Sequence, residues 1–144
     1  MIERVSISAA VEQRIREFAG EAYPHEGCGV LIGSYVDRGA RVIAVTSGRN
    51  LWTARAADRY DLDPGDILAA QREATATGLD VVGYWHSHPD HPAWPSQFDT
   101  DRAWVDYVYL IVNSVAGGTG DLGAFRLGGE GEPFDAVRLQ VGEA

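Results

Sequence analysis

Residues Asp80–Asp99, DVVGYWHSHPDHPAWPSQFD, form the most informative stretch of the sequence. Its first part, 80–88, predicts a strand. The prolines of 89–95 predict a loop, and Ser96 is placed to cap a short helix that runs to about Val105. This succession of strand, loop and helix decides the predicted fold when it is combined with the elements on either side.

The flanking sequence alternates only in part between strand and helix patterns. Apolar side chains at helical spacing predict a helix capped by Ser8 and running to about Ala22, and Asp63 begins a second helix that runs to about Thr77. The other expected elements are strands around Val5 and Ile7 and at 28–35, 41–46, 107–112, 124–127 and 136–141, with a mobile, glycine-containing loop at 113–123. The expected class is α+β, a mixed β-sheet with helices packed on its faces, in a single domain spanning residues 1–144.

Composition narrows the classes of function. The chain has 12 basic residues, all of them arginine, against 21 acidic ones, and its formal net charge is −9. Such a chain repels phosphate backbones, so nucleic-acid binding is not expected. No secretory signal and no apolar run of membrane-spanning length is evident, and the one cysteine, Cys28, is expected to be a buried small hydrophobe. A cytoplasmic protein without membrane partners is therefore expected.

The two histidines at the end of the predicted strand suggest a metal site. Since side chains alternate along a strand, His86 and His88 leave the same face and can converge on one metal ion. Asp99 lies eleven residues beyond His88, across a turn that can return it to the same point. Two histidines and a carboxylate leave a fourth position for water, which is the composition of a catalytic zinc site.

Simpler interpretations exist for each part of this pattern. A lone pair of histidines on a strand is common, and Ser96 with Asp99 also forms a helix-capping arrangement. The two roles are compatible, because a capped helix start is a rigid platform for a ligand. The remaining histidines, His25 and His91, are expected to be solvated.

Taken together, these residues match a known motif. His-x-His, seven residues, Ser, two residues and Asp occur here without a gap as His86, His88, Ser96 and Asp99. This resembles the JAMM motif of the JAB1/MPN/Mov34 zinc metallopeptidases, and the short chain is similar to their prokaryotic single-domain members. The segment PHEGCGVLIG, 24–33, resembles the family's segment around an upstream glutamate, which places Glu26 at that position.

The resemblance implies a fold, a reaction and a substrate class. The fold would be layered like that of cytidine deaminases, with one zinc ion held by His86, His88 and Asp99. Glu26 would be the general base and acid, and Ser96 would stabilise the oxyanion. The reaction would be hydrolysis of a peptide or isopeptide bond after the C-terminal Gly-Gly tail of a ubiquitin-like protein or a ThiS/MoaD-type sulfur carrier. Trp94 is a candidate wall of the substrate groove, although it is about as readily interpreted as packing for the loop.

Three other interpretations differ in class. A non-catalytic scaffold of the same fold would be expected to lack metal ligands, and this chain keeps all of them. A zinc deaminase needs a pair of cysteines, which a single Cys28 excludes. A cupin-like iron oxygenase also uses His-x-His, but the predicted helices argue against its all-β barrel.

Overall fold

The computed structural model describes residues 2–142. Within them no helix is long and apolar enough to cross a membrane, the longest having 14 residues. The elements are, in order, β1 (Arg4–Ser8), α1 (Ala9–Ala22), β2 (Cys28–Val36), β3 (Gly39–Val45), α2 (Pro64–Ala76), β4 (Asp80–Pro89), α3 (Gln97–Arg102), β5 (Val108–Val115), β6 (Gly118–Leu127) and β7 (Phe134–Gly142).

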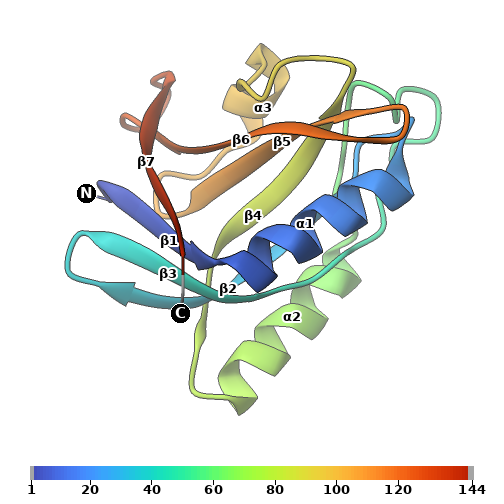
Figure 1. Cartoon of the computed structure of the whole chain (residues 1–144). Coiled ribbons are helices and arrows are strands. Elements are labelled where there is room, and N and C mark those ends of the chain that lie inside the picture. Colours follow the sequence, from blue (N-terminus) through green and yellow to red (C-terminus); the bar gives the residue numbers. More distant parts are fainter. Residues whose placement is uncertain (1, 143–144) are drawn as a thin grey trace.

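These strands form the mixed sheet expected from the sequence. Their order is β1-β3-β2-β4-β5-β6-β7, and β1 also pairs in parallel with β7, which closes the sheet into a barrel. Strand β4 is antiparallel to β2 and parallel to β5, so it is held on both edges. Figure 1 shows α3 beside the end of β4, which is where the motif residues lie. The α+β class is confirmed, and the closure of the sheet adds a feature that strand patterns did not predict.

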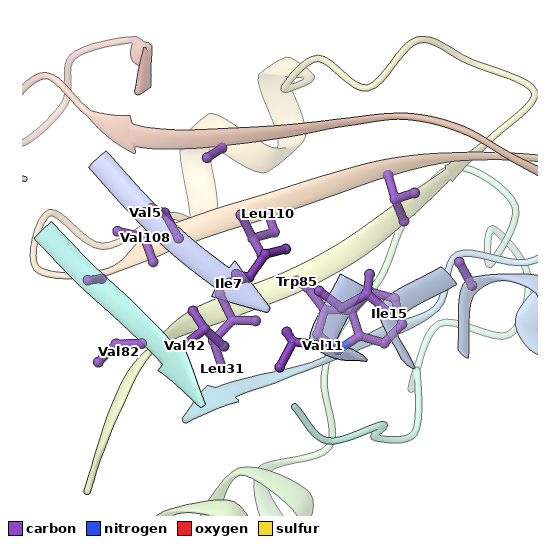
Figure 2. Packing of buried hydrophobic residues seen from close by; sticks show 14 residues of the cluster. Val5, Ile7, Val11, Ile15, Leu31, Val42, Val82, Trp85, Val108 and Leu110 are labelled. Atoms are coloured by element: carbon purple, nitrogen blue, oxygen red, sulfur yellow. The ribbon is translucent and has the colours of Figure 1, made fainter. Parts of the chain in front are cut away.

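Helix α1 packs on one face of the sheet because its apolar side chains recur at helical spacing. Val11, Ile15 and Ala19 are buried in one cluster with Trp85, which has no exposed surface. The same cluster takes residues from most of the strands, and Figure 2 shows it around Trp85. The Ser8 side chain accepts a hydrogen bond from the Val11 N–H, so the predicted cap is confirmed.

Helix α2 covers a second, smaller cluster on another face. Ala70 and Ala74 of this helix pack with Val30 and Ile32 of β2. Cys28 lies in the same cluster and is 1% exposed, as predicted for a small buried hydrophobe. Burial raises the pKa of its thiol to about 12, which keeps it uncharged and unreactive at neutral pH.

Two sequence predictions about the chain's second half are wrong. Residues 113–123 are not a mobile loop, because β5 continues to Val115 and β6 begins at Gly118. Gly120 and Gly123 allow close packing inside the hairpin, since a Cβ on them would meet the side chains of Asn113 and Phe125. Only Gly117, with a φ of 83°, makes the turn. Helix α3 also ends at Arg102, three residues before the predicted Val105.

Replacing Gly29 with alanine is expected to destabilise the protein by at least about 2 kcal/mol. A Cβ at this buried position in β2 would overlap the Thr46 carbonyl oxygen and the Trp85 indole nitrogen, which are themselves hydrogen-bonded at 2.8 Å. The matched control is Gly20→Ala in α1, where the added Cβ meets nothing within 4 Å. It should stabilise the protein by about 0.5–1 kcal/mol. Urea unfolding measures both effects, and equal stability of the two variants would contradict the packing at Gly29.

Candidate metal centre

The end of β4 presents His86 and His88 side by side on one face. Their Nε2 atoms lie 3.2 Å apart, and the residues are 1% and 6% exposed. Trp85 and Ser87 alternate with them and face the other way, where both are fully buried. The alternation predicted from the strand pattern therefore holds, and it buries both imidazoles beside each other.

Helix α3 brings Asp99 to the same point. Its Oδ2 atom lies 3.1 Å from His86 Nε2 and 3.0 Å from His88 Nε2. The start of this helix is a capping box, in which Ser96 Oγ accepts from the Asp99 N–H at 3.1 Å and Asp99 Oδ2 accepts from the Ser96 N–H at 2.9 Å. The capping and metal-site interpretations of Ser96 and Asp99 are thus compatible in one geometry.

The three converging atoms fit the requirements of a zinc ion. Ligands about 2.0–2.1 Å from a tetrahedral metal lie about 3.3–3.4 Å from each other, close to the distances found here. His88 Nδ1 is 2.9 Å from the Pro92 carbonyl oxygen, which can only accept, so Nδ1 carries the proton and Nε2 offers its lone pair. One proton can bridge only one pair of these atoms, whereas a cation satisfies all three.

Glu26 is the fourth member of this buried cluster. One ligand atom from each of Glu26, His86, His88 and Asp99 lies within 4.8 Å of all the others. Register explains the meeting, because Cys28 pairs with His86 across β2 and β4 and Glu26 lies two residues before that pair. Glu26 is 5% exposed, and its Oε1 has no hydrogen-bond partner among residues 2–142. It therefore faces the cluster without being tied to a neighbouring side chain.

Burial and charge shift the pKa values of these groups in different directions. Burial, with the charges of Asp99 and Asp58, raises the pKa of Glu26 to about 9, and a cation beside it would favour the ionised form. Burial lowers the pKa of His86. Burial opposes the charged forms of His88 and Asp99 as well. The hydrogen bonds of His88 to Asp99 and Pro92 outweigh it for His88, and the charge and hydrogen bond of His86, with the bond from His88, outweigh it for Asp99. The pKa of His88 is raised and that of Asp99 is held well below its usual range.

A cleft of about 480 Å³ opens onto this cluster. Trp94 is 59% exposed at its edge and also contacts Phe125 edge to face, with ring centroids 5.1 Å apart. It therefore lines the cleft and also packs against the loop's neighbour Phe125, while its role as a wall of the substrate groove stays a prediction. The other lining residues are Glu26, Asp58, Arg59, His88, His91, Pro92, Ser96, Gln97 and Phe98.

The segment 47–62 is polar and has no helix or strand periodicity, and sequence patterns do not predict two of its contacts to the site. The Tyr60 ring stacks on His86, with centroids 4.5 Å apart and planes 24° from parallel. This contact orients an imidazole whose Nδ1 is buried without a partner among the described residues. Asn50 hydrogen-bonds the Glu26 carbonyl from its side chain. Nothing in the spacing of this segment signals either contact, because both are made to distant parts of the chain.

Comparison with known proteins agrees with this geometry. Residues 8–127 match the family model of prokaryotic homologues of the JAB domain. Desampylase of Haloferax volcanii is 36% identical over 113 residues, covering 75% of this chain and 79% of that protein. Desampylase of Pyrococcus furiosus is 36% identical over 90 residues, which are 61% and 59% of the two chains.

A solved structure agrees on the fold. The solution structure of a protein from Desulfitobacterium hafniense, 24% identical, superposes with a TM-score of 0.83 over 97% of this chain and 94% of that one. The family match covers strands β2 to β6, all three helices and all of the clustered residues described above. The chain therefore belongs to the prokaryotic JAB family and is a hydrolase of the JAMM type.

Proposed function

We propose that this protein is a zinc-dependent isopeptidase or peptidase that hydrolyses the amide bond after the C-terminal Gly-Gly tail of a ubiquitin-like or sulfur-carrier protein. The observation that carries the proposal is the convergence of His86, His88 and Asp99 to within 3.0–3.2 Å of one another, with Glu26 beside them. The residues are buried at a cleft, so a reacting group can be shielded from bulk water. We also propose that residues 1–144 act as one domain, in the cytoplasm.

Each proposed role follows from the position of a side chain. Zinc held by His86, His88 and Asp99 supplies Lewis acidity and lowers the pKa of water to about 7. Glu26 takes the proton of the attacking water and passes it to the leaving amine, a role worth about 10²–10⁴ in rate. The Ser96 Oγ accepts from the Asp99 N–H, which leaves its own hydroxyl hydrogen free to donate to the developing oxyanion.

We infer the substrate class from the relatives and from the cleft. The name desampylase denotes removal of a ubiquitin-like modifier from its conjugates. We assign a substrate of the same class to this chain, with a glycine-only tail lying in the cleft that Trp94, Asp58 and Arg59 help to line. A tail without side chains suits a groove that leads to buried reacting groups, and backbone hydrogen bonds would hold it extended.

The purified protein is expected to contain about one zinc ion per chain and to cleave a ubiquitin-like protein joined by its Gly-Gly tail to a lysine peptide. Changing the tail to Ala-Ala should slow cleavage about tenfold or more, since a groove shaped for glycine excludes methyl groups. A parallel substrate with an ordinary peptide bond after Gly-Gly distinguishes peptidase from isopeptidase activity. Chelation should abolish turnover and added zinc should restore it.

Different failures of this experiment overturn different parts of the proposal. A protein that takes up no zinc at neutral pH contradicts the ligand set. A zinc-loaded protein that cleaves neither Gly-Gly substrate contradicts the substrate class. Equal rates on Gly-Gly and Ala-Ala tails contradict the glycine-only groove.

A further inference from the structure

The Glu26 backbone is held by one segment that lies outside all helices and strands. Its N–H donates to the Ala56 carbonyl at 2.5 Å, and its own carbonyl accepts from the Asn50 side chain at 3.2 Å. The next residue, Gly27, is tied instead to β4, through both the side chain and the N–H of Ser87. Since Glu26 Oε1 has no partner among the described residues, these backbone contacts set where the carboxylate points.

The Asn50 side chain uses its full hydrogen-bonding capacity here. Its Nδ2 donates to the carbonyls of Glu26 and Arg59, at 3.2 and 3.0 Å. Its Oδ1 accepts from the N–H groups of Trp52 and Asp61, at 3.0 and 2.9 Å. A carboxamide offers two donors and two acceptor positions, and all four are used. One half-buried side chain therefore joins both ends of the segment 51–61, here called the cleft loop, to Glu26.

The cleft loop also forms one wall of the cleft. Asp58 and Arg59 line it, and the Arg59 guanidinium lies over the Phe98 ring of α3, 4.7 Å from its centroid. Tyr60 stacks on His86. This loop has no strand or helix of its own. A backbone hydrogen bond from the Leu51 N–H to the Asp61 carbonyl, at 2.8 Å, also joins its ends, and Asn50 adds four side-chain hydrogen bonds.

We propose that Asn50 is a positioning residue that holds the cleft loop and, through it, the Glu26 carboxylate in the geometry needed for proton transfer. The proposal rests on the proposed function for its kinetic consequence, whereas its structural consequence can be measured on the protein without substrate. Misplacing a catalytic group by about 1 Å can cost about 10²-fold in rate, so a residue that fixes Glu26 has a large influence although it touches no reacting atom.

The sharpest variant is Asn50→Asp. It keeps the size of the side chain but replaces the two donors by an acceptor oxygen, which then faces the carbonyl oxygens of Glu26 and Arg59 and repels them. The amide hydrogen of Glu26 is expected to exchange with solvent at least about tenfold faster, because the cleft loop opens more often. Zinc content should stay at the wild-type level, since His86, His88 and Asp99 make no hydrogen bond to Asn50.

Asn113→Asp is the matched control. It makes the same chemical change at a side chain that donates to the His91 carbonyl at 2.7 Å and makes no hydrogen bond to the cleft loop or to Glu26 among the described residues. The exchange rate of the Glu26 amide should be unchanged in this variant. If Asn50→Asp does not fold, Asn50→Ala removes the same donors without adding charge. Failure of both to fold would overturn the proposal in favour of a purely structural role.

The kinetic test is a double-mutant cycle with Glu26→Asp, which keeps a carboxylate but shortens its reach. Asn50→Asp should lower kcat about 10–10²-fold in the wild-type background and much less in the Glu26→Asp background, because the two changes impair the same proton transfer. Equal effects in both backgrounds, an unchanged Glu26 exchange rate, or loss of zinc would each overturn the proposal. If the wild type cleaves no substrate, the proposed function fails, while amide exchange still decides the role of Asn50.

Discussion

Glu26→Gln is expected to keep the zinc content of the wild type while lowering kcat by about 10²–10⁴-fold. Glutamine has the shape of glutamate but cannot take up and release a proton at neutral pH. Because Glu26 Oε1 makes no hydrogen bond within residues 2–142, the substitution breaks no contact of that atom. The ligand atoms of His86, His88 and Asp99 remain in place, so metal binding and catalysis should separate.

Stability provides an independent check on this variant. In the metal-free protein the Glu26 pKa is raised to about 9, so between the unfolded value of 4.5 and 9 the unfolded state is ionised while the folded state holds the proton. The protonated Glu26 therefore contributes to the free energy of unfolding in full below pH 4.5, and this contribution is lost as the pH rises toward 9. Metal-free Glu26→Gln, which does not ionise, should therefore be at least as stable as the wild type at pH 7.

Three measurements together decide the role of Glu26. They are zinc per chain by elemental mass spectrometry, kcat on the Gly-Gly conjugate, and the melting temperature of the metal-free protein. Near-normal turnover would refute Glu26 as the proton carrier. Loss of zinc would instead make it a ligand.

Removing an imidazole from the cluster should abolish both zinc binding and turnover. His88→Ala removes the central side chain, which lies 3.2 Å from His86, 3.0 Å from Asp99 and 2.9 Å from the Pro92 carbonyl. The variant keeps only two of the three protein ligands. Changes to groups that merely hydrogen-bond a ligand lower metal affinity about 10–100-fold, and we expect a larger loss of zinc affinity here. Activity should fall with occupancy.

The matched control for this loss is His25→Ala. His25 is exposed and lies outside the cluster, so its removal should leave zinc content and turnover unchanged. Zinc affinity is measured by competition with a chromogenic chelator at neutral pH. Full zinc occupancy in His88→Ala would show that the ligand set is wrong, whereas loss of zinc in His25→Ala would show that occupancy does not report on this cluster.

Local sequence patterns predicted most of the helices and strands, and they predicted that His86 and His88 share one face of a strand. Capping residues and helical spacing placed α1 and α2 within a few residues of their observed ends, since these signals act between neighbours. The glycines of 113–123 led to the wrong prediction of a loop. Glycine permits a turn and also permits close packing within a strand, and only the neighbouring strand decides between the two. Asn50 and Tyr60 carried no local signal for the site, because the site residues they contact, Glu26 and His86, lie 24 or more residues away in the sequence.

The sequence by itself determined that His86 and His88 share a face and that Ser96 and Asp99 close a helix start, because these relations span a few residues and follow from backbone periodicity. Tertiary structure alone decided that Asp99 returns to the two histidines and that Glu26, 60 residues before His86, meets them. The register between β2 and β4 and the bonds from Asn50 are long-range contacts whose free energy depends on the whole fold. The pairing of β1 with β7 is also a long-range contact, since the sequence pattern of a strand does not indicate which strand it pairs with.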